Sequence, residues 1–138
     1  MNDRRDFLQL AAILAMAGPA AANAHDATPT RGRGEIARYP LEGELAGKEA
    51  VLVDLVAQPG RMDSTNAHRH PGFVLGYVIE GEYAFAINDD ETRIIKAGET
   101  FYEPAGALHY GKGSASDKPA HLLAFMVVPA GATLATPA

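Results

Sequence analysis

Cysteine is absent from the 138 residues of this sequence. Disulfide bonds and a lipid anchor on cysteine are therefore excluded, and we expect packing alone to stabilise the fold. Basic clusters are absent as well, and the net charge is −5. A chain with this balance gives no reason to expect nucleic acid or an anionic membrane surface as a partner.

The N-terminal apolar run, Leu10 to Ala17, is far shorter than the roughly 20 residues that span a bilayer. It follows Arg4-Arg5 and ends at Gly18-Pro19, and Ala22-Asn23-Ala24 fits a small-residue cleavage site. This arrangement predicts an export signal peptide over residues 1–24.

The order R-R-D-F-L-Q resembles a twin-arginine signal, the type that exports folded proteins. A general secretory signal with two ordinary positive charges is the alternative. With cleavage after Ala24, we expect a periplasmic protein that keeps no membrane anchor. Residues 25–34 include Pro29, Gly32 and Gly34 and are expected to form a flexible arm.

Residues 25–138 show no helical period. Short β-favouring segments alternate with Gly- and Pro-containing turns, which indicates an all-β sandwich or barrel over residues 35–130. We expect a hairpin turn at Asn88-Asp89-Asp90, a loop over residues 111–119 and a disordered tail over residues 131–138. The expected strands are residues 35–40, 49–57, 73–79, 82–87, 92–96, 100–103 and 120–128.

His68-Arg69-His70 precedes one of these strands. Alternate side chains of a strand share a face, so both imidazoles are predicted to point into the same space. On a helix the same spacing would turn them about 200° apart. Two converging imidazoles indicate the start of a metal site, with a third ligand from elsewhere in the chain.

Period-two alternation also predicts faces. Even-numbered positions of the strand after His70 should face the pocket, which places Phe73, Leu75, Tyr77 and Ile79 on the opposite face. A face that apolar needs cover, and we expect a homodimer. In the next strand, Ala84 and Ala86 share one face, and their small size suits the wall of a pocket.

The chain resembles the cupin family in two motifs. His68-Arg69-His70 with the closing Gly81 matches the first, and Gly98, Pro104-Ala105-Gly106 and His109 stand at the spacing of the second. The resemblance covers about residues 35–129 and implies a single jelly-roll barrel of antiparallel strands. It also implies a divalent metal held by His68, His70 and His109.

One departure from the pattern concerns the family's glutamate ligand, whose position is held by Val74. Glu103 is a candidate catalytic base near the metal; the alternative is an exposed carboxylate at a strand end. Tyr77 and Tyr102 are expected to be core or interface aromatics, and His121 a surface or core histidine. Fe(II) or Mn(II) is favoured, with Cu, Zn and Ni as alternatives, because folding before export could trap the weaker-binding metals.

Two functions are consistent with these residues. The first is a metal-dependent, dioxygenase-like enzyme that acts on a small organic molecule, since three neutral ligands leave coordination positions open. The second is a non-catalytic periplasmic module that binds a small molecule or a metal, and the missing glutamate favours it. A cupin that has lost its metal would keep the three histidines only as buried core residues.

Overall fold

In a computed structural model, the described residues are 32, 34–60 and 67–138, so the predicted export signal and most of the predicted arm lie outside them. The described chain is almost entirely β-structure, as predicted. One short 3-10 helix, η2 (Gly43–Leu45), joins the first two strands. The strands are β1 (Gly34–Pro40), β2 (Lys48–Ala57), β3 (Ala67–Arg69), β4 (Phe73–Glu80), β5 (Glu82–Ile87), β6 (Arg93–Lys96), β7 (Thr100–Glu103), β8 (Leu108–Ser114), β9 (Ala120–Pro129) and β10 (Thr136–Pro137).

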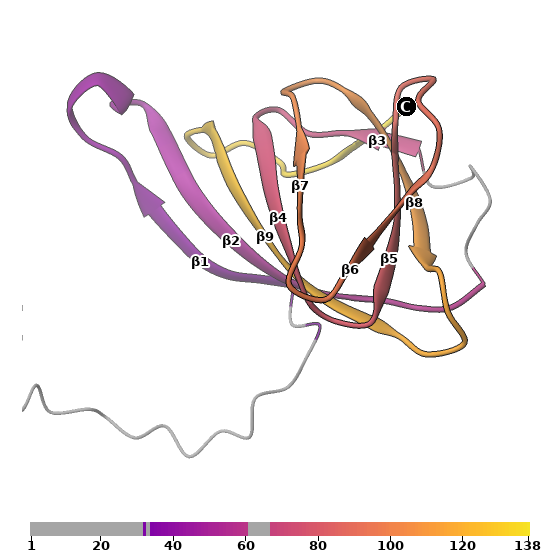
Figure 1. The fold of residues 1–138 in the computed structure, drawn as a ribbon. Helices are drawn as coiled ribbons and strands as arrows, with labels where there is room; N and C mark the ends of the chain where they lie inside the picture. The colour runs from indigo at the N-terminus through magenta and orange to yellow at the C-terminus, as the bar shows by residue number, and fades with distance from the viewer. Residues whose placement is uncertain (1–31, 33, 61–66) are drawn as a thin grey trace, which may run out of the picture.

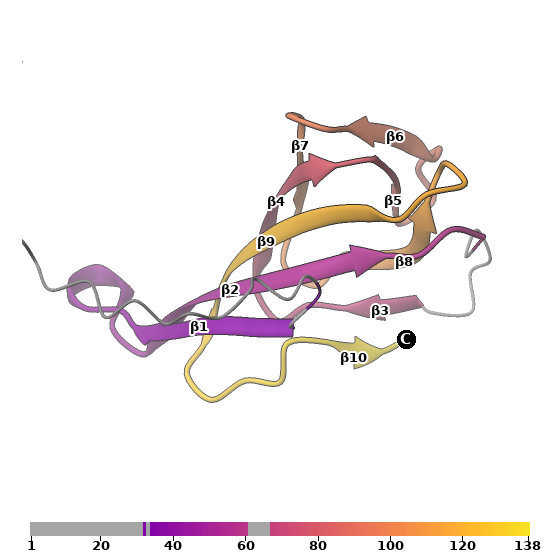
Figure 2. The ribbon, with the colours of Figure 1, turned by 90° about the horizontal axis from the view of Figure 1, so that it is seen from below.

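The strands form two five-stranded sheets, in the orders β1-β2-β9-β4-β7 and β10-β3-β8-β5-β6. Neighbouring strands are antiparallel in both sheets. The sheets face each other around the core, and the β1–β2 hairpin extends beyond the other strands (Figures 1 and 2). The predicted two-layer all-β fold is thus confirmed.

Alternation along β4 and β9 places one set of side chains inside and the other outside. Val74 and Val78 of β4 are buried, together with Leu122, Ala124 and Met126 of β9. Burial of such side chains is the main favourable contribution to folding in a chain without disulfides. The even-numbered positions of β4 face inward, as the sequence predicts.

Gly76 lies inside this layer because no larger residue fits there. A Cβ atom at this position would lie 2.0 Å from the Phe101 ring. Gly76 and Phe101 are direct partners on β4 and β7, and Phe101 is buried against Phe85 and Tyr83. The glycine therefore makes room for an aromatic ring that closes the core between the two sheets.

Two segments differ from their predicted structure. Strand β8 continues through Gly111 to Ser114, where we expect a loop, because its backbone pairs with β5 despite the glycines. Residues 131–138, expected to be a disordered tail, return to the barrel, where Thr136–Pro137 pairs with β3. Figure 2 shows β10 alongside β3. Among the described residues, no helix has the length and apolar character needed to cross a membrane.

Candidate metal centre

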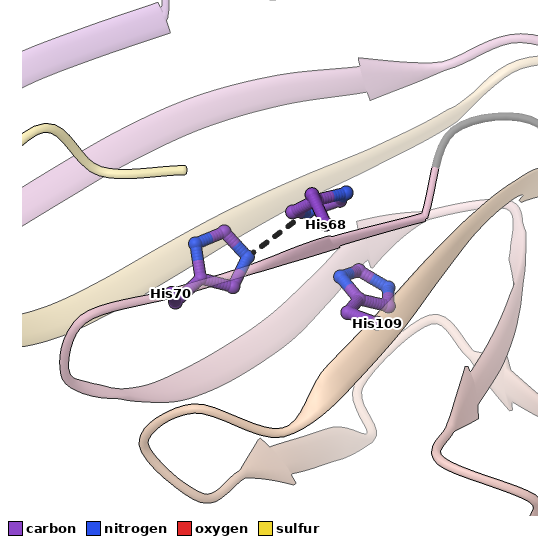
Figure 3. Close-up of side chains that lie close together, drawn as sticks. All are labelled: His68, His70 and His109. Atoms are coloured by element: carbon purple, nitrogen blue, oxygen red, sulfur yellow. Dashed lines mark hydrogen bonds between the residues drawn. The ribbon is translucent and has the colours of Figure 1, made fainter. Parts of the chain in front are cut away.

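Three imidazoles come together at the paired strands β3 and β8, as the resemblance to the cupin family implies (Figure 3). His68 on β3 is the direct cross-strand partner of His109 on β8, and His70 follows β3 immediately. One nitrogen from each ring lies within 4.8 Å of the others. The Nε2 atoms of His68 and His70 are 3.1 Å apart. Extended backbone on two paired strands therefore places three metal-ligand atoms around one point.

A backbone hydrogen bond fixes the orientation of His70. Its Nδ1 lies 2.6 Å from the carbonyl oxygen of Leu134. A carbonyl can only accept, so Nδ1 carries the proton and Nε2 presents its lone pair to His68. Metal-bound histidines commonly hold their second nitrogen in this way. The chain segment expected to be a loose tail thus orients a ligand of the site.

Burial keeps His70 and His109 neutral. It lowers the pKa of His70, and it lowers the pKa of His109 to about 3, with His68 and His70 adding to the effect on His109. A neutral imidazole is the form that binds a metal. At neutral pH the site needs no deprotonation of these two rings before it takes up a cation.

Glu103 lies inside the barrel beside these rings. Its side chain is only 2% exposed, so the alternative of an exposed strand-end carboxylate is wrong. Its Oε1 is 3.3 Å from Nδ1 of His109, and its Oε2 is 3.7 Å from Nε2 of His70. Burial raises the pKa of Glu103 to about 7.

Two buried atoms at this point have no hydrogen-bond partner among the described residues. They are Oε2 of Glu103 and Nδ1 of His109. Buried polar atoms without partners are rare and costly in folded proteins. A carboxylate and imidazoles are ordinary donors for a divalent metal, and a cation here would satisfy both atoms. The residues present therefore fit a metal ion.

Tyr83 is a further residue of the site, and the sequence analysis missed it. Its hydroxyl lies 3.0 Å from Nε2 of His109, and burial, with Glu103 adding, raises its pKa. The prediction that Ala84 and Ala86 form the pocket wall is wrong, because the opposite face of β5 points inward. Ile87 is the cross-strand partner of His109, so the side chains on the Ile87 face of β5 point to the same side as His109.

These side chains line a cavity of about 310 Å³. Its polar groups gather at the histidines, and the remaining wall is apolar. No lysine or arginine lines it within the part of the chain that the structure describes. The lining residues are Val53, Leu55, His68, His70, Val74, Tyr83, Phe101, Glu103, His109, Gly111, Leu122, Ala124, Met126, Leu134 and Ala135.

The other candidate residues lie outside this cavity. His121 is bonded to Asp54, with 2.8 Å between Nε2 and Oδ1, and borders a separate hollow of about 610 Å³. Tyr77 and Tyr102 are exposed rather than core residues, and neither lines the cavity. None of the three joins the histidine cluster.

Solved structures of known proteins are similar to this chain in fold. A search of curated proteins found no match. A solved structure from Klebsiella pneumoniae, an uncharacterised conserved protein with a double-stranded β-helix domain, is similar with a TM-score of 0.51 and 25% identity. The match covers 79% of this chain and 90% of that protein.

An oxalate decarboxylase from Lactobacillus farciminis is similar with a TM-score of 0.50 and 22% identity. The match covers 72% of this chain but only 33% of the decarboxylase, so the likeness concerns the fold. The Cupin_2 family of cupin domains matches residues 54–128, which include all three histidines and Glu103. The chain therefore belongs to the cupin family.

Proposed function

We propose that this chain is a metal-dependent cupin enzyme of the dioxygenase type that acts on a small, largely apolar organic molecule. The observation that carries the proposal is the cluster of His68, His70 and His109 at the wall of an otherwise apolar cavity. Bound there, a divalent metal supplies a Lewis acid with open positions for substrate and O2.

The cavity wall restricts the class of substrate. Apolar side chains such as Val53, Leu122 and Met126 exclude water and suit a hydrophobic body. No lysine or arginine of the described chain lines the cavity. A dicarboxylate substrate with one carboxylate at the metal would therefore find no cationic partner for its other carboxylate. We therefore favour an enol, phenol or thiol with one polar end at the histidines over a small dicarboxylate.

Glu103 is the one carboxylate that lines this cavity among the described residues. Its two oxygens lie beside the rings of His70 and His109. This position favours contact with the metal over the predicted role as a base acting on substrate. The proposed dioxygenation adds both atoms of O2 to the substrate, so the reaction needs no further reductant.

The test is oxygen uptake by protein loaded with Fe(II) or Mn(II), using a panel of enols, phenols and thiols. Mass spectrometry should find two added oxygen atoms in the product. The matched control is the His68→Ala/His70→Ala/His109→Ala variant, which should consume no oxygen. Tight capture of a panel compound without chemical change would instead support a non-catalytic binding module.

We further propose that the protein works in the periplasm, after cleavage behind Ala24. The order R-R-D-F-L-Q and the short apolar run support this. Export of the folded protein would let Fe(II) or Mn(II) be bound before copper or zinc competes for the site. A reporter fused to residues 1–24 should fail to leave the cytoplasm in a strain without twin-arginine machinery. Unchanged export there would contradict the twin-arginine route and the metal preference that depends on it, and retention in the cytoplasm of a normal strain would contradict export itself.

The outer face of the β1-β2-β9-β4-β7 sheet supports a homodimer. We define the outer apolar face as Phe73, Leu75, Tyr77, Ile79, Tyr102 and Phe125. Leu75 is 47% exposed and Tyr102 is 53% exposed, and the two are direct partners on β4 and β7. Phe73 packs its ring against Tyr102 and Phe125. An apolar patch of this kind favours association, and a second copy of the chain presents the same face.

A further inference from the structure

The position that lacks the family's carboxylate lies directly opposite Glu103. Val74 on β4 and Glu103 on β7 are cross-strand partners. Side chains of such partners share a face and lie close together, with Cβ atoms about 5 Å apart. Both residues line the cavity. Glu103 thus brings a carboxylate to the site from β7, the strand beside β4, where Val74 holds the position of the family's carboxylate.

Among the described residues, the only basic side chains close to the carboxylate of Glu103 are those of His70 and His109. Neither a lysine nor an arginine of the described residues pairs with it, and Oε2 has no hydrogen bond there. Its near polar neighbours are the ring nitrogens of His70 and His109. A buried carboxylate without a partner is unfavourable, so the arrangement calls for a cation at this point.

Three of the distances between donor atoms match a shared ion. Two atoms that are each about 2.1 Å from one metal lie about 3.0 Å apart at a right angle and at most about 4.2 Å apart. The separations are 3.1 Å between the Nε2 atoms of His68 and His70, 3.7 Å from His70 to Glu103, and 3.3 Å from Glu103 to His109. All three fall within this interval.

Hydrogen bonds hold the ring nitrogens of His70 and His109 that do not face Glu103. Leu134 engages Nδ1 of His70, and Tyr83 engages Nε2 of His109. The other two nitrogens, Nε2 of His70, which also contacts Nε2 of His68, and Nδ1 of His109, face the carboxylate.

We propose that Glu103 is the fourth, anionic ligand of the metal, supplied from β7 in place of the carboxylate missing at Val74. This inference rests on the three-histidine site of the proposed function. An anionic oxygen ligand lowers the net charge of the site and favours Mn(II) and Fe(II), which accept carboxylate more readily than softer metals do.

The test is direct metal binding by the purified chain, without reference to activity. Mn(II) affinity and the Co(II) absorption spectrum are measured for the wild type and for Glu103→Gln, which is nearly identical in shape. Glu91→Gln, at an exposed position, is the matched control. Circular dichroism of the metal-free proteins verifies that each variant is folded.

We expect Glu103→Gln to weaken Mn(II) binding about 30-fold or more and to alter the Co(II) spectrum, whereas Glu91→Gln stays within about twofold. Recovery of affinity in Val74→Glu/Glu103→Gln would further support ligation by showing that the carboxylate works from either strand. Wild-type affinity and spectrum in Glu103→Gln would overturn the inference and leave the three-histidine site intact. Absence of binding by the wild type would overturn the proposed function and the inference together.

Discussion

The carbonyl oxygen of Leu134 accepts a hydrogen bond of 2.6 Å from Nδ1 of His70. A residue near the C-terminus therefore sets the orientation of a candidate ligand 64 positions earlier in the chain. Since this contact uses the backbone of Leu134, the length of the chain matters to the site more than the identity of the side chain.

Removal of residues 133–138 should weaken metal binding about 10- to 100-fold, because His70 loses the partner that fixes its ring. Leu134→Ala keeps the carbonyl and should remain within about threefold of the wild type. Isothermal titration with Mn(II) measures both affinities. Equal loss in the two variants would mean that the side chain, and not the hydrogen bond, supports the site.

Replacing any one of His68, His70 or His109 with alanine should remove metal from the protein as purified without a histidine tag. We expect about one equivalent in the wild type and little in each variant, because a site with one ligand fewer binds far more weakly. Elemental analysis by mass spectrometry gives the content and the identity of the metal. His121→Ala should keep the metal, since His121 pairs with Asp54 outside the cavity.

The metal-free protein should lose stability as pH rises because of Glu103. Burial raises the pKa of this carboxyl from its ordinary value of 4.5 to about 7. Between these values the unfolded chain releases the proton first, so the free energy of unfolding falls as pH increases. Glu103→Gln removes this effect and should gain up to about 3 kcal/mol relative to the wild type between pH 4.5 and pH 7.5.

Urea unfolding in the presence of a chelator measures this difference at each pH. The lowered pKa of His109 acts in the opposite direction, since its contribution is lost as pH falls from 6.5 toward 3. Both proteins contain His109, so the comparison isolates Glu103. Parallel pH profiles for the wild type and Glu103→Gln would show that the carboxyl titrates normally in the fold.

Gly76→Ala should destabilise the protein by about 1–3 kcal/mol, because the new methyl group meets the Phe101 ring. Thermal unfolding of Gly76→Ala, Phe101→Leu and the double variant forms a complete cycle. The smaller leucine should relieve the clash, so the double variant should be more stable than the sum of the single effects predicts. Additive effects would argue against direct contact between the two positions.

Charge on the outer apolar face should separate the proposed homodimer. Leu75→Lys/Tyr102→Lys places two cations on adjacent strands at the centre of this face, and we expect the mass in solution to fall from two chains to one. Leu45→Lys is the control, because Leu45 is exposed in η2, away from β4 and β7. Sedimentation at micromolar concentration gives the mass. A monomeric wild type would contradict the dimer at once.

The third histidine of the site, His109, was implied by the resemblance to the cupin family. The repeated turns and the alternating pattern were sufficient to predict an all-β fold, the inward face of β4 and the convergence of His68 with His70. These features depend on local spacing, which the sequence carries directly. The position of Glu103 depends instead on the register between β4 and β7. That register follows from packing across the sheet, and no local pattern contains it.

The same reason explains two failures of the sequence analysis. Whether Tyr83 or Ala84 faces the cavity depends on how β5 pairs with β8. The contact between Leu134 and His70 joins a backbone atom to a distant ring, so residue types around Leu134 give no signal for it. A strand of two residues such as β10 is also too short to show alternation.

The candidate ligands come from both layers of the fold. His68 and His109 belong to strands β3 and β8 of one sheet, whereas Glu103 belongs to β7 of the other. With Glu103 bound, a metal ion would act as a crosslink between the sheets, in a chain that has no cysteine to form one. Unlike a disulfide, which also restricts the unfolded chain, such a link stabilises the folded state alone, because the ligands come together only on folding. A chelator would then act on this protein as a reductant acts on a disulfide-bonded domain, loosening the whole sandwich and not the cavity alone.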